Sequence, residues 1–296
     1  MSDNHRFDEK KFLVDGELKL SKRPTKAGKE LDDKTHAREM LAADVSALQE
    51  AQRKLYASDS HSLLIILQGM DAAGKDGTIR HVMGGVNPQG CRVYSFKAPN
   101  STELQHHFLW RPVSFLPERG MISIFNRSYY EEVLVVRVHP EFLIPQKLLK
   151  LKSLKENALE KLWKRRFNEI NQFENMLSDH GTVILKFYLH VSKDEQKERF
   201  LERLREPEKH WKFNDSDLTE RKLWSKYERA FEQALSKTSS KRAPWYVIPA
   251  DDKWYARAAI ADIIAAKLEA LDIDYPSVPL EDRAKFEELA HQLEQE

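Results

Sequence analysis

The sequence of 296 residues has a single cysteine, Cys91, so no disulfide bond can form within the chain. It also lacks a long hydrophobic run, because its richest stretch, residues 63–67, is five residues long and a membrane-spanning helix needs about 18. The first residues are charged and show no apolar core of a secretory signal. We therefore expect a protein of the reducing cytoplasm that neither spans nor binds a membrane.

An excess of charge of one sign is missing as well. Lys and Arg number 48 against 47 Asp and Glu, which gives a net charge of +1 and argues against a general nucleic-acid-binding protein. Basic residues are nevertheless concentrated in one place, because residues 147–166 contain eight Lys or Arg and two Glu. This segment predicts either a surface that binds a polyanion or a solvated helix face.

Glycine is scarce too, with 10 residues, but two of them directly follow the apolar segment 63–67. A short apolar run without alternation predicts a buried parallel strand. Similar runs occur at 92–96, 121–125, 183–189 and 245–249. Helical patterns lie before, between and after these runs, at 36–57, 76–83, 157–177, 219–235 and 253–271. Alternating strands and helices predict a parallel five-stranded sheet covered by helices.

The chain shows no linker rich in Gly, Pro or Ser that would divide it into two parts. We therefore expect one domain over 36–296, with a helical insertion near 193–237. Residues 1–35 are polar, and we expect them to form an extended arm or a strap over the surface. The length fits one α/β domain with insertions as well as two average domains.

Residues 69–75, Gly-Met-Asp-Ala-Ala-Gly-Lys, match the pattern G-x-x-x-x-G-K between a predicted strand and a predicted helix. Gly69 and Gly74 allow the backbone to fold around an anion, and Lys75 adds a mobile positive charge. An incidental turn is the alternative. The candidate phosphate-binding residues of this segment are Gly69, Ala72, Ala73, Gly74, Asp76, Gly77 and Thr78.

The Ser or Thr that usually follows the lysine and binds Mg²⁺ is replaced here by Asp76. We expect Asp71, inside the loop, to hold the metal instead, because a hard divalent cation prefers oxygen ligands. For Asp76, an acid favoured by the helix dipole is a better explanation than a metal ligand.

Polar residues follow the predicted strand 121–125 and are expected to face the same crevice as the loop, because ligands of open α/β sheets bind beyond the carboxyl ends of the strands. Asn126 and Arg127 are predicted to orient phosphates, and Glu131 to reach the metal or a water molecule bound to it. A surface ion pair for Arg127 and a simple helix-start acid for Glu131 remain as alternatives.

Residues 197–212 contain six Lys or Arg and predict a basic helical lid that closes over the phosphates. Arg199 and Arg203 are four residues apart on one helix face, which lets both point at the same anion. Lys209 and Lys212 are further candidates for phosphate binding. The alternative is a solvated helix with ion pairs such as Arg199 with Glu195 or Glu202.

Together these residues resemble polyphosphate kinase family 2, whose members transfer a phosphoryl group between inorganic polyphosphate and a nucleotide. The resemblance covers the loop and its continuation to Thr78, the lid from Arg199 to Lys212, and the segments 86–90, 96–99, 108–111 and 126–130. It implies a thymidylate-kinase-like P-loop fold, an α/β three-layer sandwich with a parallel five-stranded sheet and a helical lid. The implied partners are polyphosphate and purine nucleotides, without nucleic acid, in a homo-oligomer that is a dimer or a tetramer.

The resemblance also implies roles for single residues. Asp71 would hold Mg²⁺, with Mn²⁺ as an alternative, Lys75 would contact the transferring phosphate, and Arg127 would stabilise the transition state together with Arg199 or Arg203. Lys97 lies in a matching segment and is assigned to nucleotide binding.

Many family members have Asp-Arg where this chain has Asn126-Arg127. The Asn-Arg pair followed by Tyr-Tyr-Glu-Glu is similar to class III, which accepts nucleoside mono- and diphosphates, and Glu131 would then replace the missing carboxylate as a metal ligand. The rival predictions are a kinase restricted to diphosphates, an ATP-dependent nucleoside monophosphate kinase, and a P-loop module that binds polyanions or nucleic acid without chemistry.

Overall fold

All five predicted strands are present and form one parallel sheet. The structure, a computed structural model, describes residues 7–29, 31 and 33–296. The strands lie in the order β2-β3-β1-β4-β5. Their bounds are β1 Ser62–Gly69, β2 Cys91–Ser95, β3 Ile122–Asn126, β4 Thr182–His190 and β5 Trp245–Pro249. The central strand β1 is buried along its length because both of its edges are paired and helices cover both faces.

The register of the sheet sets the position of the site. Leu67 of β1 pairs with Asn126 at the end of β3, and Gly69 pairs with Leu189 near the end of β4. The carboxyl ends of these three strands therefore lie along one edge of the sheet. The polar segments that follow β1 and β3 emerge there side by side, as the sequence predicted.

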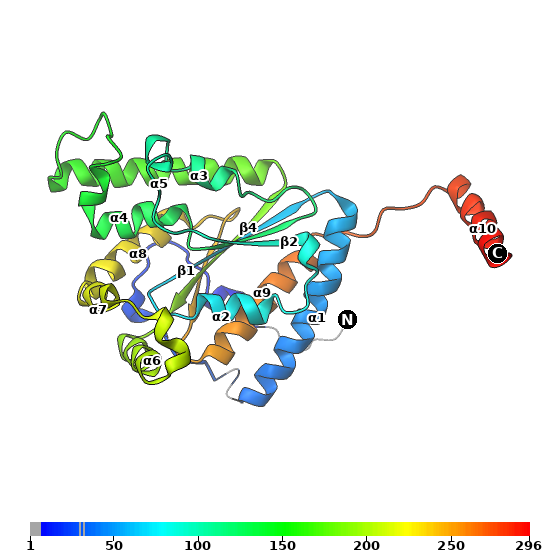
Figure 1. The fold of residues 1–296 in the computed structure, drawn as a ribbon, viewed down its shortest axis with the longest axis horizontal. Helices are drawn as coiled ribbons and strands as arrows, with labels where there is room; N and C mark the ends of the chain where they lie inside the picture. Colours follow the sequence, from blue (N-terminus) through cyan, green and yellow to red (C-terminus); the bar gives the residue numbers. More distant parts are fainter. Residues whose placement is uncertain (1–6, 30, 32) are drawn as a thin grey trace.

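Helices form a layer on each face of the sheet, which confirms the three-layer α/β architecture. Figure 1 shows α1, α2 and α9 on one face and α4, α5 and α8 on the other. The helices are α1 Lys34–Ser58, α2 Lys75–Val82, α3 Trp110–Val113, α4 Val135–Val138, α5 Glu156–Asp179, α6 Lys193–Arg205, α7 Asp215–Lys222, α8 Trp224–Thr238, α9 Lys253–Glu269 and α10 Leu280–Glu294. Short 3₁₀ helices are η1 Glu9–Lys11, η2 Leu20–Lys22, η3 Pro88–Gly90, η4 Glu103–Gln105, η5 Tyr129–Val133, η6 Pro140–Leu143 and η7 Pro207–Lys212.

The helix predicted at 219–235 is not continuous, because it breaks at Leu223 into α7 and α8. A capping box between Asn214 and Asp217 starts α7 earlier than the hydrophobic pattern suggested. The apolar face of α8, with Phe231, Ala234 and Leu235, is buried in the core. Within the segment predicted as an insertion, α6, η7 and α7 therefore lie over the carboxyl edge, whereas α8 belongs to a helical layer of the body (Figure 1).

Residues 7–29 of the predicted N-terminal arm form a strap along the edge of the sheet, and residues 1–6, 30 and 32 of that arm lie outside the described residues. Val14 donates its backbone N–H to Trp245 at 2.9 Å, and Val247 donates to Phe12 at 2.8 Å. Leu13 and Tyr246 form an antiparallel bridge there. The strap also contributes side chains to the core that its polar composition hides, because Phe12 and Val14 are each 4% exposed.

The end of the chain differs from the rest, because α10 lies away from the other helices in Figure 1. Across the described residues, no helix combines the length and the apolar character that crossing a membrane requires.

Candidate active site

The predicted phosphate loop connects β1 to α2 at the carboxyl edge of the sheet. A Cβ atom on Gly69 would lie 3.0 Å from the carbonyl oxygen of Leu189, so the close approach of β4 requires glycine there. Gly74 has a φ of 103° and Ala72 a φ of 60°, both in the left-handed region. These conformations give the loop the concave shape that cradles an anion at a helix N-terminus.

Lys75 lies against the loop and is 8% exposed. Its Nζ donates hydrogen bonds to the carbonyl oxygens of Gly69 at 2.8 Å and Met70 at 3.3 Å. Burial, together with the charge of Arg127, lowers the pKa of Lys75 to about 8, although nearby carboxylates oppose this shift. The protein therefore holds a partly desolvated ammonium group where an anion would find it strongly attractive.

Asp71 and Arg127, which the sequence placed at one site, form an ion pair with 2.9 Å between Nη2 and Oδ1. Arg127 has a φ of 64°, unusual for a residue other than glycine. Its backbone N–H donates to Leu67 of β1 at 3.1 Å, which fixes the turn after β3. The ion pair that was the alternative prediction for Arg127 therefore forms, and the partner of Arg127 is Asp71, the predicted metal ligand.

Asn126 and Asp76 also come together, although they are 50 residues apart in the sequence. The side-chain amide of Asn126 donates to Asp76 Oδ1 at 2.6 Å and to Ser95 Oγ at 3.4 Å. Asp76 therefore has a defined partner at the end of β3, in addition to its place in the first turn of α2. Gly77 and Thr78 follow in the same helix, and Thr78 is buried.

Two cavities meet at Arg127 and Glu131, since both residues line each of them. The smaller cavity, of about 220 Å³, contains the end of β1, Asp71, and Asp217 and Tyr227 from the helices above. Burial raises the pKa of the Glu131 carboxyl, while Arg127 and Lys75 oppose that shift. Three of the charged residues predicted for phosphate chemistry, Asp71, Arg127 and Glu131, therefore line the small cavity, and the last two also line the large one.

The larger cavity, of about 580 Å³, has an apolar and aromatic wall with basic groups set into it. The Arg111 guanidinium lies 5.0 Å from the centroid of the Phe96 ring, and that of Arg166 lies 5.1 Å from the Phe108 ring. Lys97 lines this cavity too. Such a site suits a ligand with a flat apolar part and negative charges.

The basic segment 147–166 divides between this cavity and the surface. Lys150, Arg165 and Arg166 line the cavity, and Arg166 is 2% exposed and paired with Glu132 at 3.1 Å. Lys161 and Lys164 are exposed on α5. Lys147, Lys152 and Lys155 are exposed as well, so part of the segment lies at the surface and part of it is a wall of the large cavity.

Arg199 is 5% exposed and fastens the back of the phosphate loop. Its guanidinium donates to the carbonyl oxygens of Ala72 and Ala73, each at 2.9 Å, and to those of Ala250 and Asp251 at 2.6 and 2.9 Å. Its Nε donates to Glu195 at 2.7 Å, the ion pair that the sequence left as an alternative. In this conformation Arg199 therefore positions the loop from behind.

The other predicted lid residues have partners within the lid. Arg203 lies 3.6 Å from the Asp217 carboxylate and donates to the carbonyl oxygen of Lys212 at 3.3 Å. Lys209 pairs with Glu202 and with Glu206, and Lys212 Nζ lies 5.0 Å from the ring of Trp211. The structure does not bring Arg199 and Arg203 to a shared anion site, because the two guanidinium groups have different partners.

Gln196 is a site residue that the sequence analysis missed. It lines the small cavity and donates from Nε2 to the carbonyl oxygen of Asp71 at 2.9 Å. It precedes Arg199 by three residues, so helical spacing could have placed both on one face towards the loop. Tyr227, which also lines the cavity, lies in the interrupted helix pattern and carried no such signal.

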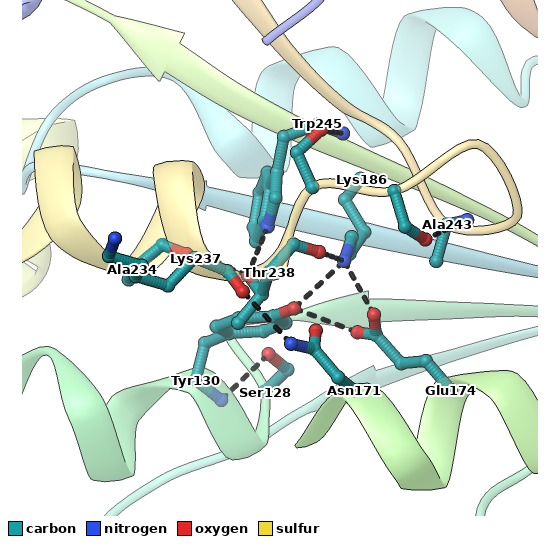
Figure 2. Close-up of polar contacts among 12 residues, drawn as sticks. Ser128, Tyr130, Asn171, Glu174, Lys186, Ala234, Lys237, Thr238, Ala243 and Trp245 are labelled. Carbon is teal, nitrogen blue, oxygen red and sulfur yellow. Dashed lines mark hydrogen bonds and ion pairs between the residues drawn. The ribbon is translucent and has the colours of Figure 1, made fainter. Parts of the chain in front are cut away.

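A buried network supports the turn after β3. The Tyr129 and Tyr130 hydroxyls donate to Glu174 Oε1 at 2.7 and 2.8 Å. Lys186 Nζ donates to Glu174 Oε2 at 2.5 Å, to the Tyr130 hydroxyl at 2.9 Å and to the carbonyl oxygen of Thr238 at 2.7 Å (Figure 2). Lys186 and Glu174 are 0% and 2% exposed. The network anchors the segment between Arg127 and Glu131 to α5, β4 and α8.

The predicted metal ligands, Asp71 and Glu131, line the same small cavity. Within the described ranges, no three His, Cys, Asp or Glu side chains are grouped so that they could hold a metal ion. Carboxylate oxygens suit Mg²⁺, which proteins commonly bind through one or two carboxylates together with substrate phosphates. The residues therefore fit a cation that is bound jointly with a phosphate.

Comparison with known proteins assigns this arrangement to a family. The family model for polyphosphate kinase 2 matches residues 30–276. An ADP-polyphosphate phosphotransferase from Rhodopseudomonas palustris is 49% identical over 286 residues, 96% of this chain and 98% of that protein. An AMP/ADP-polyphosphate phosphotransferase from Meiothermus ruber is 48% identical over 243 residues, 82% of this chain and 85% of that protein.

A solved structure agrees with these matches. The crystal structure of polyphosphate kinase 2 from Arthrobacter aurescens TC1 superimposes with a TM-score of 0.83 at 38% sequence identity. The alignment covers 94% of this chain and 95% of that one. Sequence and fold therefore point to the same family over nearly the whole chain.

Proposed function

This chain belongs to the polyphosphate kinase 2 family, and on that premise we propose that it transfers phosphoryl groups between inorganic polyphosphate and purine nucleoside mono- and diphosphates. One observation carries the proposal: Arg127 and Glu131 line both the small cavity at the phosphate loop and the large aromatic cavity. A donor phosphate at the loop and an acceptor phosphate from the large cavity would meet at these two residues.

The acceptor nucleotide is assigned to the large cavity. The Phe96 and Phe108 rings offer apolar surface for a base, and Lys97, Arg111 and Arg166 offer positive charge for phosphates. The donor is assigned to the loop, where Lys75 and backbone N–H groups attract the terminal phosphate of the polymer.

In the forward reaction an oxygen of the acceptor's terminal phosphate forms a bond to the terminal phosphorus of polyphosphate. The bond from that phosphorus to the bridging oxygen breaks, and the shortened polymer leaves with the electron pair. Lys75 and Arg127 stabilise the negative charge of the transferring group, because phosphoryl transfer depends mainly on positioning and charge neutralisation. Asp71 and Glu131 would hold Mg²⁺, which supplies further charge neutralisation when bound.

The direct test of the function is ATP formation from ADP, Mg²⁺ and long-chain polyphosphate. We expect ATP to accumulate in proportion to enzyme and polyphosphate. A second reaction mixture contains ATP and AMP without polyphosphate and measures whether ATP itself serves as the phosphoryl donor. Reaction of ATP with AMP, without any ATP formed from polyphosphate and ADP, would instead identify an ATP-dependent nucleoside monophosphate kinase.

Acceptor choice gives a second prediction: the wild type phosphorylates both AMP and ADP. At present the Asn126 amide donates to the Asp76 carboxylate at 2.6 Å. Asn126→Asp would bring two carboxylates together there, and their combined negative charge would attract a cation to the end of β3. We expect this variant to shift preference towards ADP, and Glu131→Ala to damage AMP phosphorylation more than ADP phosphorylation. The ratio of kcat/KM for the two acceptors measures both effects.

Asn126→Ala is the matched control, because it removes the same hydrogen bond without adding charge. A shift towards ADP as large as that of Asn126→Asp would contradict the charge argument. A wild type that makes ATP from ADP but no ADP from AMP, with adenylate kinase contamination excluded, would restrict the enzyme to diphosphates.

The expected homo-oligomer is measured separately by light scattering.

A further inference from the structure

A third cavity, of about 450 Å³, lies on the face of the sheet formed by α1, α2 and α9. These helices pack side by side in Figure 1. Basic side chains from all three line it: Lys34 and Arg38 from α1, His81 from α2, and Lys253 and Arg257 from α9. The cavity is separate from the two that meet at Arg127 and Glu131, because it shares no lining residue with them.

The carboxylates of this third cavity already have partners. Glu195 is paired with Arg199 at 2.7 Å. Asp251 and Asp252 each accept a backbone N–H, at 2.7 and 2.9 Å. These interactions partly neutralise the negative charge of the three carboxylates and fix the surrounding backbone.

Three of the five basic side chains lack such partners among the described residues, whereas Lys253 lies 3.8 Å from the Glu202 carboxylate and the His81 ring contacts the carbonyl oxygen of Gly77 at 2.7 Å. In the part of the chain that the structure describes, the side chains of Lys34, Arg38 and Arg257 make no hydrogen bond or ion pair. Burial and the positive charges of Arg80 and Arg199 lower the pKa of Arg257. A group of unpaired cations around one cavity is a favourable environment for a multiply charged anion.

The cavity adjoins the phosphate loop directly. Arg257 Nη2 lies 3.4 Å from the position of a Cβ atom on Gly77, in the first turn of α2 after Lys75. Arg199 joins the carbonyl oxygens of the loop to that of Asp251, which lines the cavity. The path from Lys75 to the unpaired cations therefore crosses the first turn of α2, where Gly77 adds no side chain.

We propose that this cavity binds the phosphates of the donor polymer that follow the one being transferred, so that polyphosphate runs from Lys75 past Gly77 to Arg257 and Arg38. The inference rests on the proposed function, because it assumes a polyphosphate donor. It places the polymer on the α1, α2 and α9 face and not along α5, where the sequence suggested a basic surface. Each phosphate placed beside a cation releases counterions, which makes binding dependent on salt.

The test is the double variant Arg38→Ala/Arg257→Ala, assayed with ADP and either long-chain polyphosphate or tripolyphosphate. The short donor ends near the loop, so its KM should change less than about twofold, whereas the KM for the long polymer should rise roughly tenfold, with a smaller change in kcat. The slope of log KM for the polymer against log salt concentration should fall by roughly one unit for each arginine removed.

Two control variants locate the effect. Arg53→Ala removes an exposed arginine of the same helix α1, paired with Glu50 at 3.4 Å, and should leave both KM values unchanged. Lys161→Ala/Lys164→Ala removes two exposed charges from α5 and should leave the KM for the polymer unchanged.

Three results would overturn the inference. They are equal KM changes for short and long donors in the Arg38/Arg257 variant, a polymer-specific effect only in the Lys161/Lys164 variant, and a rise only in the KM for ADP. A wild type that uses neither donor length would instead refute the proposed function itself.

Discussion

Lys75→Met is expected to lower turnover by about two orders of magnitude or more, because Lys75 places a charge on the transferring phosphoryl group in a site with little water. The same substitution should leave the free protein as stable as the wild type, or more stable. Lys75 is 8% exposed, and burial lowers its pKa to about 8, so holding the charged form costs the folded state free energy. Methionine fills a similar volume without that charge.

The pH dependence of stability checks this account. The pKa of Lys75 is about 8 in the folded protein against an ordinary value of 10.5, so between these two values the unfolded chain binds more protons. The free energy of unfolding of the wild type should therefore rise with pH through this window, relative to Lys75→Met. Thermal unfolding of both proteins from neutral to alkaline pH measures the difference.

Asp71→Asn is the matched partner variant, because it removes a charge from the same loop and retains the size of the side chain. We expect a similar loss of turnover with an intact fold. Activity within tenfold of the wild type at either position would show that the loop between Gly69 and Lys75 does not hold the transferring phosphate.

Lys186→Met is expected to have the largest effect on stability. It removes the ammonium group that lies beside Glu174 in Figure 2. Glu174 is then charged and buried with only the Tyr129 and Tyr130 hydroxyls as partners. Breaking a buried ion pair in this way costs about 3–5 kcal/mol. Because Tyr129 and Tyr130 connect Arg127 to Glu131, we also expect kcat to fall in the folded fraction. Urea unfolding and assays at low temperature separate the two effects.

The double variant Lys186→Met/Glu174→Gln tests the cause. A glutamine keeps an oxygen that accepts from Tyr129 and Tyr130 but carries no charge, so the double variant should be more stable than Lys186→Met alone. Lys237→Met, at an exposed position of α8, is the control and should change the free energy of unfolding by less than about 0.5 kcal/mol. A loss below about 1 kcal/mol for Lys186→Met would contradict the importance of the buried pair.

Much of the fold could be predicted from the sequence, because the signals are local. All five predicted segments overlap a strand. The apolar signal has a physical reason in β1, β3, β4 and β5, because these strands are buried and need apolar side chains at most positions, whereas the edge strand β2 is largely exposed. The spacing from Gly69 to Lys75 indicated the phosphate loop, because only glycine tolerates the close approach of Leu189 and the φ of Gly74. Asp71 and Arg127 were assigned to one site because parallel strands end at the same edge.

Other features were decided only when distant surfaces came together. Charge and helical spacing could not distinguish an Arg199 that faces substrate from one that donates to four carbonyl oxygens behind the loop. The buried pair of Lys186 and Glu174 had no sequence signal, because a charged residue within an apolar strand shows its partner only after α5 packs on β4. The same holds for the unpaired Arg38 and Arg257, which lie 219 positions apart and line one cavity because α1 packs against α9. Local patterns determine which elements form, whereas the packing of those elements determines which charges are paired and which remain available to a ligand.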